Sequence, residues 1–230
     1  MGFLKRGSLF IFSHIQRMTQ YNVTFPFQAR YFKIGEISPN TEQVWFVLHG
    51  QGQLASFFIR KFRALQENKI CVIAPEGLSH YYLDGYAGRV GSTWMTKENR
   101  LMDIENYIQY LNTICIKELT GTGFTGKITI LGFSQGAATA SRWAMDGKVN
   151  FNRLILWGGI FPPDMNFEKG HELLNEKETY LVYGKSDPFL TDDKFAEMRN
   201  LSERLQIKPT EITFDGQHDI DEKTLLSLIH

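Results

Sequence analysis

Short runs of apolar and β-branched residues recur along the chain from residue 44 onward, and segments with helical periodicity separate them. The runs are Val44–Leu48, Ile70–Ala74, Ile128–Leu131, Arg153–Trp157, Thr179–Tyr183 and Glu211–Phe214. Continuous apolar runs of about four to eight residues are typical of strands that are buried on both faces of a sheet. Their alternation with helical segments predicts an α/β fold, in which a mostly parallel central sheet carries helices on both faces.

Between these runs the apolar residues recur at helical spacing. This spacing predicts helices at Gln53–Asn68, Glu98–Leu119 and Asp193–Leu205, and a terminal helix from about Asp221. Ahead of the first buried run, the segments Tyr21–Phe27 and Ala29–Ile34 alternate apolar and polar residues on either side of Pro26. That alternation predicts a hairpin of two edge strands.

The first 17 residues differ from the rest of the chain. Lys5 and Arg6 precede the short apolar run Ser8–Phe12, as at the start of a signal peptide, but no small-x-small cleavage site follows. We therefore expect residues 1–17 to be a poorly ordered or accessory extension, and residues 18–230 to form a single domain. No run approaches the roughly 18 apolar residues of a membrane span.

Composition narrows the range of partners. Lys and Arg together number 25, as do Asp and Glu, so there is no electrostatic argument for nucleic acid or an anionic membrane. Cys71 and Cys115 lie in a predicted strand and a predicted helix, without the spacing of a metal site or a redox pair. We expect both to be buried free thiols in a reducing compartment, which indicates the cytoplasm. A homodimer is the default oligomer because closed twofold dimers are the commonest.

The strand expected at Ile128–Leu131 runs directly into Gly132-Phe133-Ser134-Gln135-Gly136, and small, helix-compatible residues follow. A G-x-S-x-G sequence between a strand and a helix is the setting of a nucleophile elbow, whose serine occupies a strained turn. The N-terminus of the following helix favours negative charge that develops near Ser134. The alternative is a glycine-rich turn whose serine has no catalytic role.

A catalytic serine needs a base, and the base needs an acid to fix its tautomer. In this type of fold the chain order is serine, acid, histidine. Of the histidines after Ser134, only His218 follows a predicted strand; His171 and His230 do not. Among the intervening aspartates, Asp187 combines a preceding strand with a proline that fixes the turn. The alternatives are an Asx turn at Asp187 and a structural role for His218.

Two backbone N–H groups are expected to form the oxyanion hole, those of Gln135 and of Gln51 after the first buried strand. His49 precedes Ser134 in the chain, so a role in fixing the oxyanion loop fits it better than catalysis. The segment Glu76–Thr96 has no periodicity and is rich in aromatic residues. We expect it to pack over the site, with Tyr81, Tyr82, Tyr86 and Trp94 lining a partly apolar substrate pocket. The alternative is that these aromatics only plug the end of the sheet.

Four motifs in order resemble the phospholipase/carboxylesterase family of small α/β-hydrolases, to which acyl-protein thioesterases belong. They are Leu48-His-Gly-Gln-Gly52, Gly132-Phe-Ser-Gln-Gly136, Gly184-Lys-Ser-Asp187 and the late His218. The resemblance spans about Gln43 to the C-terminus. It implies a serine carboxylesterase that hydrolyses small-molecule esters, and thioesters as well, without a cofactor or metal. Its nucleophile, acid and base would be Ser134, Asp187 and His218, with Gln51 and Gln135 as oxyanion donors.

The sequence also departs from the family pattern. Gln217 stands where a glycine usually precedes the histidine, and Gln51 stands where an apolar residue often follows His-Gly. The stretch Arg89–Lys97 does not match the acyl-protein thioesterases, so a protein substrate is not implied. An acyltransferase or peptidase-type reaction on the same fold, and a non-catalytic binding protein, remain alternative functions.

Overall fold

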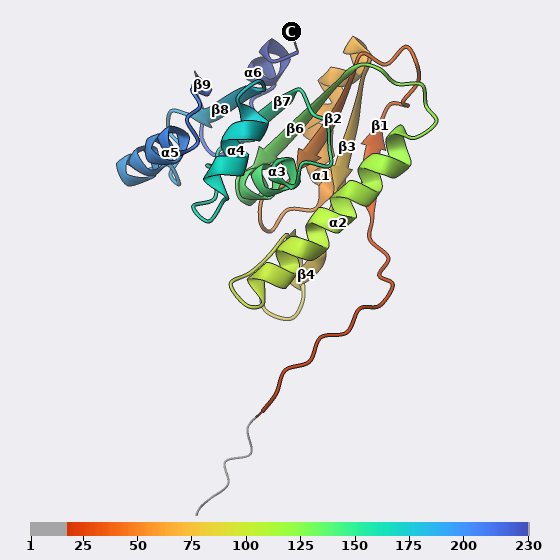
Figure 1. The fold of residues 1–230 in the computed structure, drawn as a ribbon, viewed down its shortest axis with the longest axis vertical. Coiled ribbons are helices and arrows are strands. Elements are labelled where there is room, and N and C mark those ends of the chain that lie inside the picture. Colours follow the sequence, from red (N-terminus) through yellow and green to blue (C-terminus); the bar gives the residue numbers. More distant parts are fainter. Residues whose placement is uncertain (1–17, 230) are drawn as a thin grey trace, which may run out of the picture.

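The computed structural model describes residues 18–229, which fold around a 7-stranded sheet with the order β1-β3-β2-β6-β7-β8-β9 (Figure 1). The strands are β1 (Tyr31–Ile34), β2 (Gln43–Leu48), β3 (Ile70–Pro75), β6 (Lys127–Phe133), β7 (Arg153–Trp157), β8 (Glu178–Gly184) and β9 (Thr210–Phe214). Only β1 runs antiparallel to its neighbour in this sheet, and the other pairs are parallel. The predicted, mostly parallel sheet is therefore confirmed.

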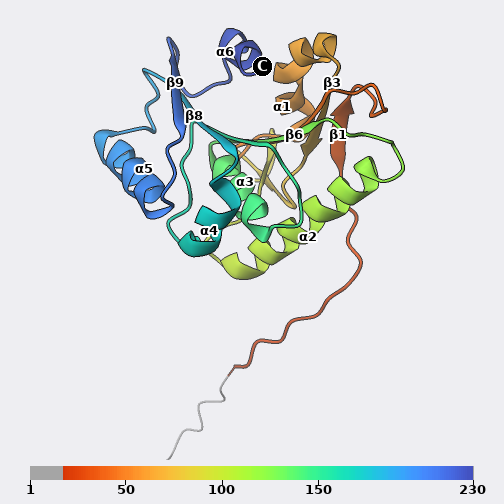
Figure 2. The same cartoon turned by 45° about the horizontal axis from the view of Figure 1, so that its top comes forward.

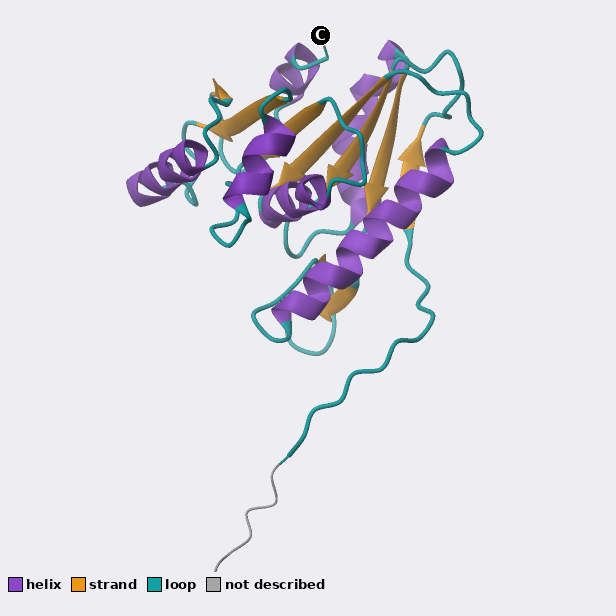
Figure 3. Ribbon diagram, in the orientation of Figure 1, coloured by secondary structure: helices purple, strands orange, loops and turns teal. Residues whose placement is uncertain are grey.

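Helices cover both faces of the sheet (Figures 2 and 3). They are α1 (Ala55–Phe58), the 3₁₀ segment η1 (Ile59–Asn68), α2 (Arg100–Leu119), α3 (Gln135–Asp146), α4 (Phe167–Leu174), α5 (Asp192–Arg204) and α6 (Glu222–Ser227). Alternate residues of β2 show the two layers. Val44, Phe46 and Leu48 pack in the cluster that includes α2, α3 and α5, whereas Trp45 and Val47 pack with α1, η1 and α6. None of the helices in the described part is long and apolar enough to cross a bilayer.

The hairpin predicted at the start of the chain is wrong, because only β1 forms. Residues 18–30 are extended without strand pairing and lead away from the body of the molecule (Figure 1). The Arg30 carbonyl accepts hydrogen bonds from the Tyr110 hydroxyl, 2.5 Å, and from the Glu76 N–H, 3.3 Å. These contacts place the chain for pairing between β1 and β3, whereas Tyr21–Phe27 finds no partner strand. The extension expected at residues 1–17 lies outside the described residues.

Three further predictions concern local features of the chain. The helix predicted over Gln53–Asn68 is a single α-turn followed by 3₁₀ structure, and the aperiodic segment after β3 contains a hairpin of β4 (Ser79–Tyr82) and β5 (Val90–Thr93). Cys71 and Cys115 are buried free thiols, as predicted. Burial raises the pKa of Cys71 to about 12 and that of Cys115 to about 11.

Candidate active site

Ser134 occupies the turn between β6 and α3 in a strained backbone conformation, with φ 54° and ψ −118°. Positive φ is costly for a residue with a Cβ and is retained where the surrounding structure enforces it. The flanking glycines make the turn sterically feasible. A Cβ on Gly132 would lie 2.1 Å from the carbonyl oxygen of Gly136, and one on Gly136 would lie 2.2 Å from that of Leu48. The sequence therefore forms the predicted elbow.

His218 and Asp187 meet beyond the ends of β9 and β8. Nδ1 of His218 lies 2.6 Å from Oδ2 of Asp187, and the Asp187 side chain is only 1% exposed. Its other oxygen accepts a hydrogen bond of 2.9 Å from the N–H of Phe189. Because a carboxylate accepts, Nδ1 carries the donated proton, which leaves Nε2 of the neutral ring as a proton acceptor.

Aromatic rings hold the imidazole next to the elbow. The ring centroids of Phe133 and Phe189 each lie 4.7 Å from that of His218, and Phe133 directly precedes Ser134. Within the described residues no hydrogen bond joins Ser134 to His218. Catalytic hydrogen bonds of this kind are often long until substrate binds, so this geometry does not argue against the pair.

The two expected oxyanion donors come from loops that touch. A Cβ on Gly50 would lie 3.1 Å from Cβ of Ser134, so the loop after β2 abuts the elbow. The Gly50 N–H donates to Gln53 Oε1, and the Gly52 N–H donates to the Ser92 carbonyl. By contrast, the N–H groups of Gln51 and Gln135 have no hydrogen-bond partner in the part of the chain that the structure describes. Both are available to a ligand.

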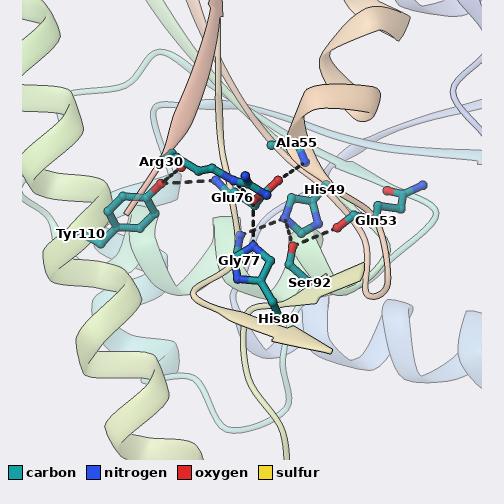
Figure 4. A network of polar contacts seen from close by, with 9 residues as sticks. All are labelled: Arg30, His49, Gln53, Ala55, Glu76, Gly77, His80, Ser92 and Tyr110. Atoms are coloured by element: carbon teal, nitrogen blue, oxygen red, sulfur yellow. Dashed lines mark hydrogen bonds and ion pairs between the residues drawn. The ribbon is translucent and has the colours of Figure 1, made fainter. Parts of the chain in front are cut away.

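His49 lies in a network of polar contacts with Gly77 and Ser92 (Figure 4) and also contacts the loop after β2. Its Nδ1 lies 2.8 Å from the Gly50 carbonyl, and its Nε2 accepts from the Gly77 N–H at 2.9 Å and lies 3.1 Å from Ser92 Oγ. The ring is fully buried, and this burial lowers the pKa of His49 to about 4. A neutral ring with both nitrogens engaged suits the expected structural role.

Glu76 anchors the same region with a buried carboxylate (Figure 4). It forms an ion pair with Arg30, lies 2.8 Å from His80 Nε2, and accepts from the N–H of Ala55 at 2.9 Å. Burial acts to raise the pKa of Glu76, but the hydrogen bonds from His80, Arg30 and the Ala55 N–H hold it below its usual range. The carboxylate thus fixes the start of α1, directly after the oxyanion loop.

Thr93 at the end of β5 and Trp94 directly after it connect the start of α3 to the loop after β2. The Gln135 side chain accepts from Thr93 Oγ1 at 3.0 Å and from the Trp94 N–H at 3.1 Å. The indole of Trp94 donates to the carbonyl of His49 at 2.8 Å and stacks on its ring, 5.0 Å between centroids. The sequence analysis assigned only the backbone of Gln135 and missed this role of its side chain.

A cavity of about 340 Å³ opens beside Ser134. It is lined by Ala138 and Arg142 of α3, the loop segment 158–163, and Phe189, Leu190, Lys194 and Glu197. None of the aromatic residues predicted to form the pocket lines it. Trp94 is buried against His49, whereas Tyr81, Tyr82 and Tyr86 are exposed in the β4–β5 region. The structure thus brings His218 and Asp187 into contact, with Phe133 of the elbow against His218, and it places the loop after β2 against Ser134. It leaves the predicted pocket residues outside the cavity.

The loop after β7, Gly158-Gly-Ile-Phe-Pro-Pro163, is a part of the site that the sequence analysis did not assign. Gly158 has φ +57°, and a Cβ there would lie 3.0 Å from Cε1 of His218. A Cβ on Gly159 would lie 2.6 Å from the carbonyl oxygen of Ser134. The signal was available, because this loop also follows the C-terminal end of a buried strand, where ligands bind in such sheets.

A family model described as Phospholipase/Carboxylesterase matches residues 30–230. No curated protein sequence matches the chain significantly. Among solved structures, acyl-protein thioesterase 2 of Zea mays is similar with a TM-score of 0.66 and 16% identity, covering 87% of this chain and 96% of that one. Esterase PE8 is similar with a TM-score of 0.63 and 18% identity, covering 87% of this chain and 96% of that one. The Bacillus cereus carboxylesterase is similar with a TM-score of 0.61 and 14% identity, covering 86% of this chain and 91% of that one. At these identities the likeness shows the fold, which is that of α/β-hydrolases.

Proposed function

Because the chain belongs to the phospholipase/carboxylesterase family of hydrolases, we propose that it hydrolyses carboxylic esters through Ser134, His218 and Asp187. The observation that carries the proposal is the 2.6 Å contact between His218 Nδ1 and the buried Asp187 carboxylate. A structural histidine has no need of a buried carboxylate that fixes its tautomer beside a strained serine. The N-terminus of α3 next to Ser134 adds a favourable field for an oxyanion.

In this mechanism Ser134 Oγ attacks the acyl carbon while His218 Nε2 accepts its proton. The tetrahedral intermediate collapses when His218 protonates the leaving alcohol, and an acyl-enzyme remains. Water then attacks the acyl-enzyme, with His218 again acting as base and Ser134 as leaving group. Asp187 keeps the imidazole in the required tautomer and stabilises the imidazolium.

The Gln51 and Gln135 N–H groups would stabilise the oxyanion in both steps. They are free of other partners in the described chain, and Trp94 is hydrogen-bonded to both segments, through the Gln135 side chain and the His49 carbonyl. Preorganised donors of this type contribute about 10²–10³ in kcat each. Because the related maize protein is named a thioesterase, we include thioesters among the substrates; the chemistry of the attack is the same.

The test is hydrolysis of p-nitrophenyl acetate and butyrate, together with labelling by a fluorophosphonate. Ser134→Ala should abolish labelling and lower kcat by about 10⁴-fold or more, as expected when a nucleophile is removed. Ser227→Ala, on the terminal helix α6, is the matched control and should leave both readouts unchanged. An active wild type that is labelled elsewhere, or no activity and no labelling, would refute the proposal. Added alcohol or amine acceptors would reveal acyl transfer.

A further inference from the structure

The cavity beside the nucleophile extends along one face of α3. Ser134, Ala138 and Arg142 line it and follow one another at every fourth position. Residues at this spacing lie above one another on a helix, and eight residues rise by about 12 Å. The cavity therefore leads from the reactive hydroxyl to a guanidinium group.

The walls between these two ends are mostly apolar. They are formed by Ala138, Ile160, Phe161, Pro162, Pro163, Phe189 and Leu190. Such a wall accommodates a hydrocarbon segment of a substrate, because apolar surface gains free energy when it leaves water. No hydrogen bond from these side chains would orient a polar group along the way, so polar recognition falls to the far end.

The far end carries an excess of positive charge. The Asp164 carboxylate is shared by two guanidinium groups: Arg142 donates to it at 2.8 Å, and Arg100 also pairs with it. One carboxylate neutralises only one of the two. The Arg142 side chain is only 10% exposed, so its charge is poorly screened by water.

Helix α5 contributes a second cation to the same cavity. Lys194 lines it and pairs with Glu197 at 2.6 Å, and about half of the Lys194 side chain is exposed. Together, Arg142, Lys194 and Glu197 leave a net charge of +1 among the charged side chains that line the cavity. An anionic group entering the cavity would meet two cationic side chains.

We propose that the enzyme prefers esters in which an apolar spacer separates the scissile carbonyl from a second, anionic group that binds between Arg142 and Lys194. This inference rests on the proposed function, since it names the substrate class of the Ser134 site. Carboxylate is the simplest such anion, because it accepts charge-assisted hydrogen bonds from guanidinium and ammonium groups. The acid part or the alcohol part of the ester could carry the charge, and the substrates below separate the two.

The substrates are matched pairs in which the second group is either a carboxylate or its methyl ester, and rates for dimethyl suberate are divided by two because it has two equivalent scissile esters. For the acid part, monomethyl suberate carries the anion and dimethyl suberate is its neutral counterpart. For the alcohol part, the acetyl ester of 8-hydroxyoctanoate is compared with the acetyl ester of methyl 8-hydroxyoctanoate. We expect kcat/KM to be at least about tenfold higher for the anionic member of one pair, which is the gain that one charge-assisted hydrogen bond contributes. The anionic advantage should shrink as salt is added.

Two variants move the charge in opposite directions. Lys194→Gln should lower the ratio of kcat/KM for anionic over neutral ester by about threefold, within the range of a partly exposed ion pair. Glu197→Gln removes the competing carboxylate and should raise that ratio by a similar factor. Lys69→Gln, in an exposed pair with Glu42 outside the cavity, is the control for overall charge and should leave the ratio unchanged.

A purely structural role for these side chains would change both substrates of a pair alike and leave the ratio where it was. An equal ratio in the wild type and both variants would overturn the inference. That outcome is distinct from failure of the proposed function, in which neither member of any pair is hydrolysed and Ser134 is not labelled. Where the Arg142→Gln variant folds, it should lower the ratio of kcat/KM for anionic over neutral ester by more than Lys194→Gln does.

Discussion

Replacing Gly158 by alanine tests whether the His218–Asp187 pair is the working base of the enzyme. Gly158 follows β7 with φ +57°. The new methyl group would lie 3.0 Å from Cε1 and 3.1 Å from Nδ1 of His218, and 3.4 Å from Oδ2 of Asp187. Contacts that short force the imidazole to move by a few tenths of an ångström. The substitution therefore disturbs the pair without removing any of its functional groups.

The size of the effect follows from two terms. A left-handed backbone conformation costs a residue with a Cβ about 1–2 kcal/mol. The loss of unfolded-state freedom returns about 0.4–1 kcal/mol, so the net cost is about 1 kcal/mol. For a chain of this size that corresponds to a fall in Tm of about 2–4 °C. A misplacement of about 1 Å costs roughly 10²-fold in rate, so the smaller shift here should lower kcat about tenfold.

Gly147→Ala is the matched control. Gly147 also has positive φ, +78°, but the nearest atoms to its new methyl group would be those of Leu173 at 3.8 Å, in ordinary contact. Both variants should lose similar stability in thermal unfolding, whereas only Gly158→Ala should lose kcat on p-nitrophenyl butyrate. If the two variants had the same kcat, the assignment of His218 as the base would be refuted.

Three further changes probe the oxyanion loop and its support. Burial lowers the pKa of His49 to about 4 in the folded protein, whereas its ordinary pKa, as in the unfolded chain, is near 6.5. Between these values only the unfolded chain binds the proton. The free energy of unfolding should therefore fall by about 3 kcal/mol as pH drops from 6.5 to 4, with little further loss below. Urea unfolding at both ends of that range, compared with His49→Gln, isolates this contribution. Gln51→Pro should lower kcat about 10²–10³-fold, whereas Gln51→Ala should change it only a few-fold, because the donor is a backbone N–H. Glu76→Ala should cost about 1–3 kcal/mol in urea unfolding, since the Ala55 N–H loses its acceptor.

The alternation of buried strands and helices was enough to predict the sheet and the edge at which polar residues gather. Asp187 and His218 were found from their position after strands, and the structure places them in contact. Both deductions used local features of the chain, an apolar run and the turn residues that end it. The strained conformation of Ser134 was predicted in the same way from the flanking glycines.

The substrate cavity could not be predicted, because its walls depend on side-chain direction within loops. Periodicity gives direction only in helices and strands. Periodicity therefore did not show that Tyr82 and Tyr86 are exposed or that the Tyr81 hydroxyl lies beside Gly52. The segment 158–163 follows a buried strand, which indicated a place near the site, but its sequence did not show which side chains line the cavity. The strand expected at Tyr21–Phe27 failed for a related reason, since alternation predicts a strand without showing that a partner strand exists.

Strand register explains why residues so far apart in sequence form one site. In the pairing of β2 with β6, Leu48 lies opposite Gly132, so the loop at Gly50 comes to lie against the elbow. In the pairing of β8 with β9, Gly184 lies opposite Phe214, which brings the turns carrying Asp187 and His218 side by side. A slip of one residue in either pair would move every side chain of the slipped strand to the other face of the sheet. The buried apolar residues of these strands therefore hold the geometry of the candidate site in place as well as the fold, and substitutions in the core that permit a slip should abolish activity together with stability.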